Sequence, residues 1–169
     1  MTAPGLVSAW GLTVAAPAGW DVALYRRAPG PGESTHAVLH AGTFALPVER
    51  GDYGDGAVQR MGSGDVFVAL CEFHSSATGT ALFASSAQPA AISADTFSRT
   101  SLQVAQPGQA GSQAFFSVAG RAWCLYVVVG SYEDRARLSG VTNALLGSVA
   151  IGPWKSPAPA IQGPAGGRA

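Results

Sequence analysis

Three histidines and one glutamate supply the residue types that a metal or hydrolytic site would use. His36 and His40 stand four positions apart, a spacing that on a helix would place both imidazoles on one side. The surrounding residues favour a strand, where positions four apart lie about 13 Å from each other, too far for one metal ion. His74, Glu72 and Cys71 add further ligand types without a recognised spacing. We expect ordinary, partly exposed histidines, with a metal site as the alternative.

Residues 51–65 form the most individual stretch of the chain, because glycine and aspartate mark loops at both of its ends. The aspartates do not have the Asp-x-Asp-x-Asp-Gly spacing of a calcium loop, and no Gly-Lys-Ser/Thr follows to cradle a phosphate. The segment is interpreted as a capped loop around a short helix, with a loop that contacts a partner as the alternative. The candidate partner-contact residues are Asp52, Tyr53, Asp55, Arg60 and Asp65.

Nucleophilic chemistry has no recognisable signature in this sequence. No Gly-x-Ser-x-Gly elbow occurs, and Cys71 and Cys124 lie inside apolar runs without a flanking catalytic motif. We expect two buried thiols, with a disulfide between neighbouring strands as the alternative. Glu72 and Asp65 are the carboxylates nearest the expected core; a buried Glu72 could have a raised pKa, but we expect it to be exposed at a strand end. We assign no catalytic, cofactor-binding or metal-binding residue.

Composition limits the class of protein further. The chain has 169 residues, 47% hydrophobic and 12% charged, and ten basic residues balance ten acidic ones. Such a chain is not disordered over most of its length, and it has no basic excess with which to bind nucleic acid. No apolar run reaches the roughly 18 residues of a membrane-spanning helix. Residues 1–19 have no Lys or Arg and do not resemble a secretory signal, so we expect a cytoplasmic protein, with the mature part of an exported protein as the alternative.

The apolar pattern predicts a turn-rich, mainly β protein. Valine and aromatic residues favour strands, and the 22 glycines and 11 prolines fall between apolar runs. Trp20 and Trp123 are assigned to the core. Residues 66–73 are apolar on both faces until Glu72, which indicates a central strand. Other strands are expected at 11–16, 20–27, 35–46, 101–105 and 149–151, a loop at 28–32, and two helical turns within 57–61.

The strongest local signal is a hairpin formed by residues 113–119 and 122–129. Gly120-Arg121 between the two runs predicts a type II′ turn, which would set Val118 opposite Trp123 and Phe116 opposite Leu125. One face of this hairpin would belong to the core. That face would carry Ala114, Phe116, Val118, Trp123, Leu125, Val127 and Val129.

A helix is expected to follow the hairpin. Ser131 is its predicted N-cap, and Gly147 suits its C′ position. Leu138, Val141 and Leu145, with Ala144 beside them, form the apolar stripe that should pack on the hairpin. Residues 1–151 are predicted to be one α+β domain, and the Pro/Gly/Ala-rich residues 152–169 a flexible tail.

The two ends of the chain resemble a known group. Ala16-Pro17-Ala18-Gly19-Trp20 after a short strand, and a last strand feeding a helix that ends in Leu145-Leu146-Gly147-Ser148-Val149, are similar to the Mog1/PsbP-like group of small α/β/α proteins. The resemblance implies an antiparallel sheet and a mostly non-catalytic role as a binding partner, assembly factor or exported lipoprotein domain. The group has no universal active site, so the resemblance assigns no residue a role.

We therefore predict an α+β fold with a mostly antiparallel sheet and the C-terminal helix packed on one face. The leading hypothesis for function is a non-enzymatic interaction or accessory domain that presents a sheet face or the loop 51–65 to a protein partner or to a second copy of itself, without nucleic acid and without a membrane span. The first alternative is a small-ligand or metal-binding domain with hydrolytic activity. The second is a self-assembling structural subunit.

Overall fold

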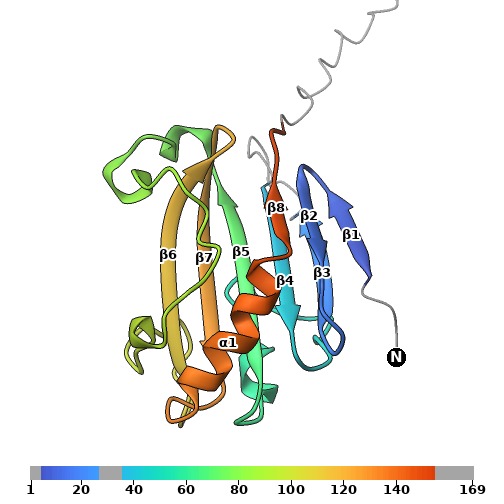
Figure 1. Cartoon of the computed structure of the whole chain (residues 1–169), viewed down its shortest axis with the longest axis vertical. Coiled ribbons are helices and arrows are strands. Elements are labelled where there is room, and N and C mark those ends of the chain that lie inside the picture. Colours follow the sequence, from blue (N-terminus) through green and yellow to red (C-terminus); the bar gives the residue numbers. More distant parts are fainter. Residues whose placement is uncertain (1–4, 27–35, 155–169) are drawn as a thin grey trace, which may run out of the picture.

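Two antiparallel sheets and one α-helix make up the described part of the chain, residues 5–26 and 36–154 of a computed structural model (Figure 1). The smaller sheet has the order β1-β2-β8 and the larger one β3-β4-β5-β7-β6. The predicted α+β fold with a mostly antiparallel sheet is confirmed. The elements are β1 (Leu6–Ala9), β2 (Leu12–Ala15), β3 (Asp21–Arg26), β4 (Ala37–Gly42), η1 (Val58–Arg60), β5 (Val66–Phe73), η2 (Ser75–Ala77), η3 (Ala81–Phe83), η4 (Ala94–Thr96), β6 (Ala110–Val118), β7 (Arg121–Val129), α1 (Arg135–Leu146) and β8 (Val149–Ile151).

The middle of the larger sheet is buried on both faces. Every residue of β4 and β7 is buried, as are the first six residues of β5, which confirms the central strand predicted at 66–73. Alternate side chains of these strands enter two separate apolar clusters, one on each face. Neither face of the central strands is therefore open to a partner.

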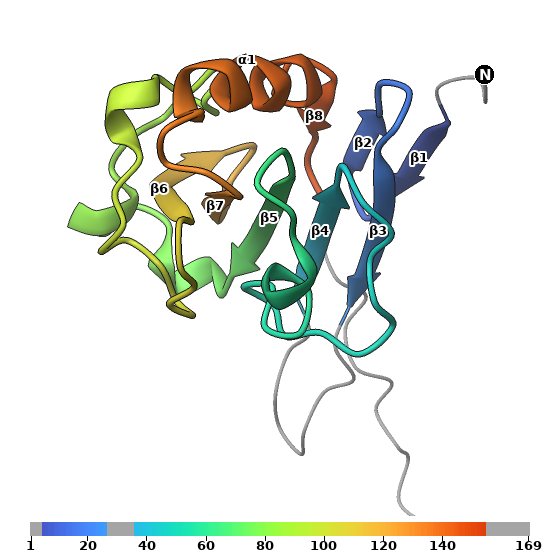
Figure 2. The same cartoon turned by 90° about the horizontal axis from the view of Figure 1, so that it is seen from below.

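The first face is covered by the helix and the smaller sheet. Figure 2 shows α1 lying across this face, with β8 leading from it toward β2. Leu138 and Leu145 of α1 pack there with Leu12 and Val14 of β2 and with Trp123 of β7. The docking of the C-terminal helix on one face and the core position of Trp123 are confirmed.

Irregular chain covers the second face. Phe44 and Leu46 leave the sheet after Gly42 and pack on this face, so the strand predicted at 35–46 is shorter than expected. The strand predicted at 101–105 is wrong, because Leu102 and Val104 lie on the same face without joining the sheet. The two helical turns expected within 57–61 reduce to the single 3-10 turn η1, whose Val58 is buried.

The hairpin forms as predicted, but its register is different. Val118 pairs with Arg121 and Phe116 with Trp123, because the turn residues are Ala119 and Gly120 rather than Gly120 and Arg121. Both turn residues have positive φ, 53° and 71°, which corresponds to a type I′ turn instead of type II′. The pairing differs from the predicted one by two positions, so each side chain keeps its predicted face.

The helix starts later than the sequence indicates. Its N-cap is Asp134, and the Ser131 hydroxyl instead accepts a hydrogen bond from the Asp134 amide in the turn before it. Ala144 is exposed, and the buried face includes Ser139 and Thr142, whose hydroxyl groups bond to carbonyls of the preceding turn. Gly147 is the C-cap in a right-handed conformation, not a left-handed C′ residue.

Two predictions fall outside the described residues. The loop at 28–32 lies in the undescribed segment 27–35, and the tail is described only as far as residue 154. Three other predicted strands are confirmed, because 11–16, 20–27 and 149–151 contain β2, β3 and β8, whereas the sequence did not indicate β1. Across residues 5–26 and 36–154, no helix has the length and apolar character needed to cross a membrane.

Candidate functional site

A buried histidine organises the second face of the larger sheet. His40 lies on β4 with a fully buried side chain. Its Nδ1 lies 2.7 Å from Nε of Arg50, and its Nε2 lies 2.8 Å from the carbonyl oxygen of Asp52. The Tyr25 hydroxyl donates to Oδ1 of Asp52 at 2.9 Å, and the Tyr25 ring meets the His40 ring edge to face. We call Tyr25, His40, Arg50 and Asp52 the His40 cluster.

The partners of His40 define its protonation state. Arginine can only donate and a carbonyl can only accept, so Nδ1 is the acceptor and Nε2 carries the proton. Burial lowers the pKa of His40 to about 4, and the positive charge of Arg50 acts in the same direction against the Asp52 contacts. With both nitrogens engaged, this imidazole has no lone pair left to act as a base or to bind a metal.

The same contacts fix the loop that follows β4. Arg50 Nη1 donates to the Pro47 carbonyl, and the Leu46 amide donates to Asp21 at 2.8 Å. Gly56 has a φ of +87°, and a Cβ there would lie 2.8 Å from the Glu49 carbonyl oxygen, so only glycine allows the two loop segments to approach. Between these anchors the Val48 side chain is 95% exposed.

Val48 does not stand alone on this part of the protein. The exposed Glu49 follows it, and the close approach of Gly56 to the Glu49 carbonyl brings the backbone beside the exposed Asp55 near Glu49. Gln59 donates to Asp55 at 2.7 Å and accepts from the Gly56 amide at 2.8 Å. We call Val48, Glu49, Asp55 and Gln59 the Val48 surface: an exposed apolar residue together with exposed polar residues of two neighbouring loop segments.

The five candidate partner-contact residues occupy different environments. Asp52 points toward Tyr25, and the Tyr53 ring packs on Tyr126 with centroids 5.7 Å apart. Asp65 accepts hydrogen bonds from Thr43 and Gly62 and holds the turn before β5. Only Asp55 and Arg60 are exposed. The outward surface of residues 51–65 is therefore smaller than its polar sequence indicates.

The two cysteines lie opposite each other on neighbouring strands. Cys71 of β5 pairs with Cys124 of β7, and both are buried thiols, as the sequence predicts. The Cys71 thiol contacts the Asp52 carbonyl oxygen at 3.5 Å. Burial raises the pKa of Cys124 to about 11, although hydrogen bonds with Tyr53 and Gln113 act to lower it. A thiol with this pKa is almost entirely protonated near neutral pH and is a poor nucleophile.

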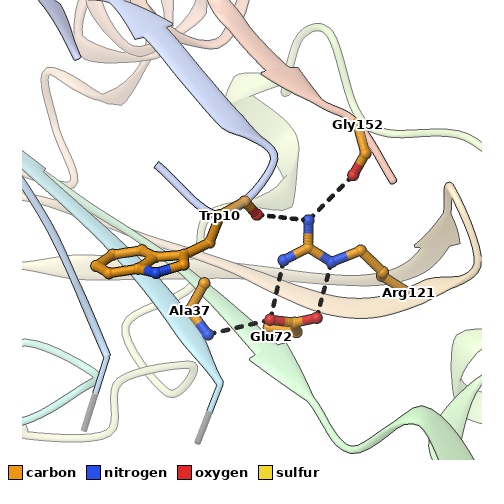
Figure 3. A network of polar contacts seen from close by, with 5 residues as sticks. All are labelled: Trp10, Ala37, Glu72, Arg121 and Gly152. Atoms are coloured by element: carbon orange, nitrogen blue, oxygen red, sulfur yellow. Dashed lines mark hydrogen bonds and ion pairs between the residues drawn. The ribbon is translucent and has the colours of Figure 1, made fainter. Parts of the chain in front are cut away.

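Glu72 is not exposed at a strand end, which corrects the prediction. Both of its carboxylate oxygens accept hydrogen bonds from Arg121, at 2.7 and 3.0 Å, and one also accepts from the Ala37 amide (Figure 3). Arg121 also donates to the carbonyl of Trp10, in the turn between β1 and β2, and to the carbonyl of Gly152, which follows β8. The ion pair therefore ties the two sheets together.

The electrostatics of Glu72 agree with a structural role. Burial acts to raise its pKa, but the hydrogen bonds from Arg121 and the Ala37 amide outweigh burial and leave the pKa lowered. The side chains of Glu72 and Arg121 are only 12% and 4% exposed, and the guanidinium also lies over the Trp123 ring. Four of the five N–H groups of Arg121 and both carboxylate oxygens of Glu72 are bonded within the protein, so the pair has little to offer a substrate.

The histidines do not converge with Glu72 on one point. The rings of His36 and His74 lie with centroids 6.0 Å apart, and His74 Nδ1 interacts with Ser76. His36 is half-buried and His74 is exposed, in line with the prediction, whereas the prediction is wrong for the buried His40. In the described part of the chain, no three His, Cys, Asp or Glu side chains are grouped so that they could hold a metal ion.

A small apolar cavity lies between α1, β8 and the larger sheet. Leu39, Phe116, Leu146 and Val149 are among the residues that line it. Its volume of about 10 Å³ is close to that of one water molecule. It is a gap in the packing rather than a site for an organic ligand.

Sequence reasoning did not find Val48, Arg50 or Arg121. The sequence placed Arg121 in a turn. In the structure Ala122 pairs with Phe73, and this register brings Arg121 close to Glu72, its bidentate partner. The register of β5 with β7 would have revealed this pair, but no local motif does. For Arg50, the only local signal is a single basic residue in the short segment between Pro47 and Gly51.

Comparison with known proteins adds no further assignment: no family model, no curated protein and no solved structure matches this chain.

Proposed function

We propose that this protein is a non-enzymatic interaction or accessory domain and that it binds a protein partner through the Val48 surface. The observation that carries the proposal is the 95% exposure of Val48 on a loop that the hydrogen bonds of Arg50 to His40 and Pro47 hold in place. A single exposed apolar residue is common on protein surfaces. Here the surrounding loop is already ordered, so binding would cost little conformational entropy.

Other exposed apolar residues support this choice less well. Leu6 and Trp154 are 70% and 40% exposed, but each stands close to residues outside the described ranges. Leu82 is 59% exposed on η3, beside the buried Phe83. The other surface considered from the sequence, a sheet face, loses its basis because both faces of the central strands are covered.

The same proposal includes three further expectations. They are a cytoplasmic location, protein rather than nucleic acid as the partner, and kinship with the Mog1/PsbP-like group. The neutral net charge supports the second expectation. A small-ligand site has less support, because His40 and Glu72 are engaged with other groups of the protein and the apolar cavity is small.

Site-specific photo-crosslinking tests the proposal. A photoreactive phenylalanine replaces Val48 in one variant and the exposed Ala144 of α1 in the control. We expect a light-dependent product of one defined mass from the first variant only. An excess of the protein without the photoreactive residue should abolish this cross-linked product, and an excess of the Val48→Asp protein should not.

The mass of the product identifies the kind of partner. A product of twice the chain mass would mean that a second copy occupies the Val48 surface, and a different mass would mean another protein. Equal products from both positions, or equal competition by the Val48→Asp protein, would overturn the proposal.

A further inference from the structure

The two buried thiols are placed so that they can react with each other. They are the only cysteines in the chain, and β5 and β7 set them directly opposite. Both side chains enter the same apolar cluster, so both sulfur atoms lie on the same face of the sheet. We propose that Cys71 and Cys124 form a reversible cross-strand disulfide and that the dithiol is the reduced state of this redox pair.

The ladder geometry sets the spacing of the two cysteines. The Gly130 amide donates to the Asp65 carbonyl at the end of the same strand pair. Hydrogen-bonded and non-hydrogen-bonded pairs alternate along an antiparallel ladder, and Cys71–Cys124 lies an even number of positions from Asp65–Gly130. Cα atoms of hydrogen-bonded pairs are about 5.5 Å apart. Disulfides span Cα distances of roughly 4.4–6.8 Å, so the Cα spacing is compatible with the bond. The Cβ atoms of a hydrogen-bonded pair lie farther apart than the roughly 3.8 Å of an ordinary disulfide, so the two strands must also move slightly closer for the bond to form.

Burial restricts each cysteine to the other as a partner. Cys124 is fully buried and Cys71 is 5% exposed, so neither sulfur can reach a cysteine of another molecule in the native state. A glutathione adduct would also have to fit into a packed cluster beside Tyr53 and Phe115. Only the internal disulfide is compatible with the packing of this face.

The reaction is thiol–disulfide exchange with a low-molecular-weight disulfide such as glutathione disulfide. The more exposed Cys71 attacks as a thiolate, forms a mixed disulfide and releases one glutathione. The Cys124 thiolate then attacks the Cys71 sulfur and releases the second glutathione. The two protein thiols lose two electrons and two protons, and two glutathione thiols receive them. The mixed disulfide forms while the Asp52–Tyr53 segment is displaced, as it is during refolding.

Equilibrium refolding tests this assignment without depending on access to the folded core. The full-length protein is unfolded, refolded in a glutathione redox buffer and quenched with acid, and its remaining thiols are alkylated in denaturant. A second sample stays in denaturant with the same buffer. We expect the folded sample to favour the disulfide over the dithiol at least about tenfold more than the unfolded chain, because the fold has already brought the two ends of the loop together.

Mass spectrometry distinguishes the outcomes. The expected product is lighter than the reduced chain by two hydrogen atoms, contains a Cys71–Cys124 linked peptide and returns to the dithiol with excess reductant. The Cys71→Ser and Cys124→Ser variants should not give this product. A folded sample with no more disulfide than the unfolded one, or with glutathione adducts alone, would overturn the proposal. The comparison of folded and unfolded samples of the unaltered chain tests the proposal even if a serine variant fails to fold.

Discussion

Acidification from pH 7 to pH 5 should destabilise this protein through the protonation of His40 in the unfolded chain. The imidazole is neutral in the folded state, with a pKa of about 4, whereas an unfolded chain has a histidine pKa near 6.5. The unfolded state therefore binds more protons between these two values, and stability falls as the pH falls. The stabilisation that comes from the neutral His40 is fully present above about pH 6.5 and is lost below about pH 4.

The size of this effect follows from the difference between the two pKa values. At 1.36 kcal/mol for each pKa unit, the full loss is about 3 kcal/mol, and the part between pH 7 and pH 5 is about 2 kcal/mol. No discount for solvent screening is needed, because the His40 side chain is fully buried. With a urea m-value of roughly 2 kcal/mol/M, the unfolding midpoint should move by about 1 M.

Urea unfolding at a series of pH values between 7 and 5 provides the assay. This window lies above the ordinary carboxylate range, so the lowered pKa of Glu72 does not contribute. In His40→Gln, where an amide can still donate to Asp52 and accept from Arg50, most of the pH dependence should disappear. The matched control His74→Gln changes an exposed histidine and should keep it. An unchanged pH slope in His40→Gln would refute the reasoning.

Three further substitutions test the packing that surrounds the site, each by urea unfolding. Glu72→Gln leaves the guanidinium of Arg121 buried without its counter-charge and should lower the free energy of unfolding by about 3–5 kcal/mol. Replacing both Glu72 and Arg121 with methionine removes the unpaired charge and should be less costly. A double variant that is no more stable than Glu72→Gln would contradict the explanation. Gly130→Ala should cost more than about 2 kcal/mol, because its Cβ would lie 1.9 Å from the Gly62 carbonyl oxygen. Gly140→Ala, in open space on α1, should instead stabilise by about 1 kcal/mol, and a loss there would show that the helix position is not free.

Sequence periodicity was sufficient for the main features of the fold. The two apolar runs around Gly120 predicted the central hairpin, and the continuous apolar run at 66–73 predicted its neighbour β5. Face assignments were robust because side chains alternate with a period of two, so a register error of two positions leaves every residue on its predicted face.

Periodicity was misleading where apolar residues cover a sheet instead of joining it. Leu102 and Val104 alternate as in a strand, yet they pack on the second face while the Gln103 amide donates to the Tyr126 hydroxyl. Phe44 and Leu46 do the same after β4. An extended segment on a sheet face buries the same alternating residues as an edge strand, so local pattern does not distinguish the two.

The sequence by itself indicated every strand of the two sheets except β1, together with a strand at 101–105 that does not form. It also determined which side of each hairpin strand is apolar and that a helix docks at the end. Only the tertiary structure decided the partners of the polar groups. Ala119 adopts a positive φ in the turn, and the resulting register sets Arg121 over Trp123 and against Glu72. His40 likewise meets Arg50 through a loop closure. The physical reason is that burial pattern is local, whereas a buried charge selects its partner from whatever the folded chain brings within hydrogen-bond distance.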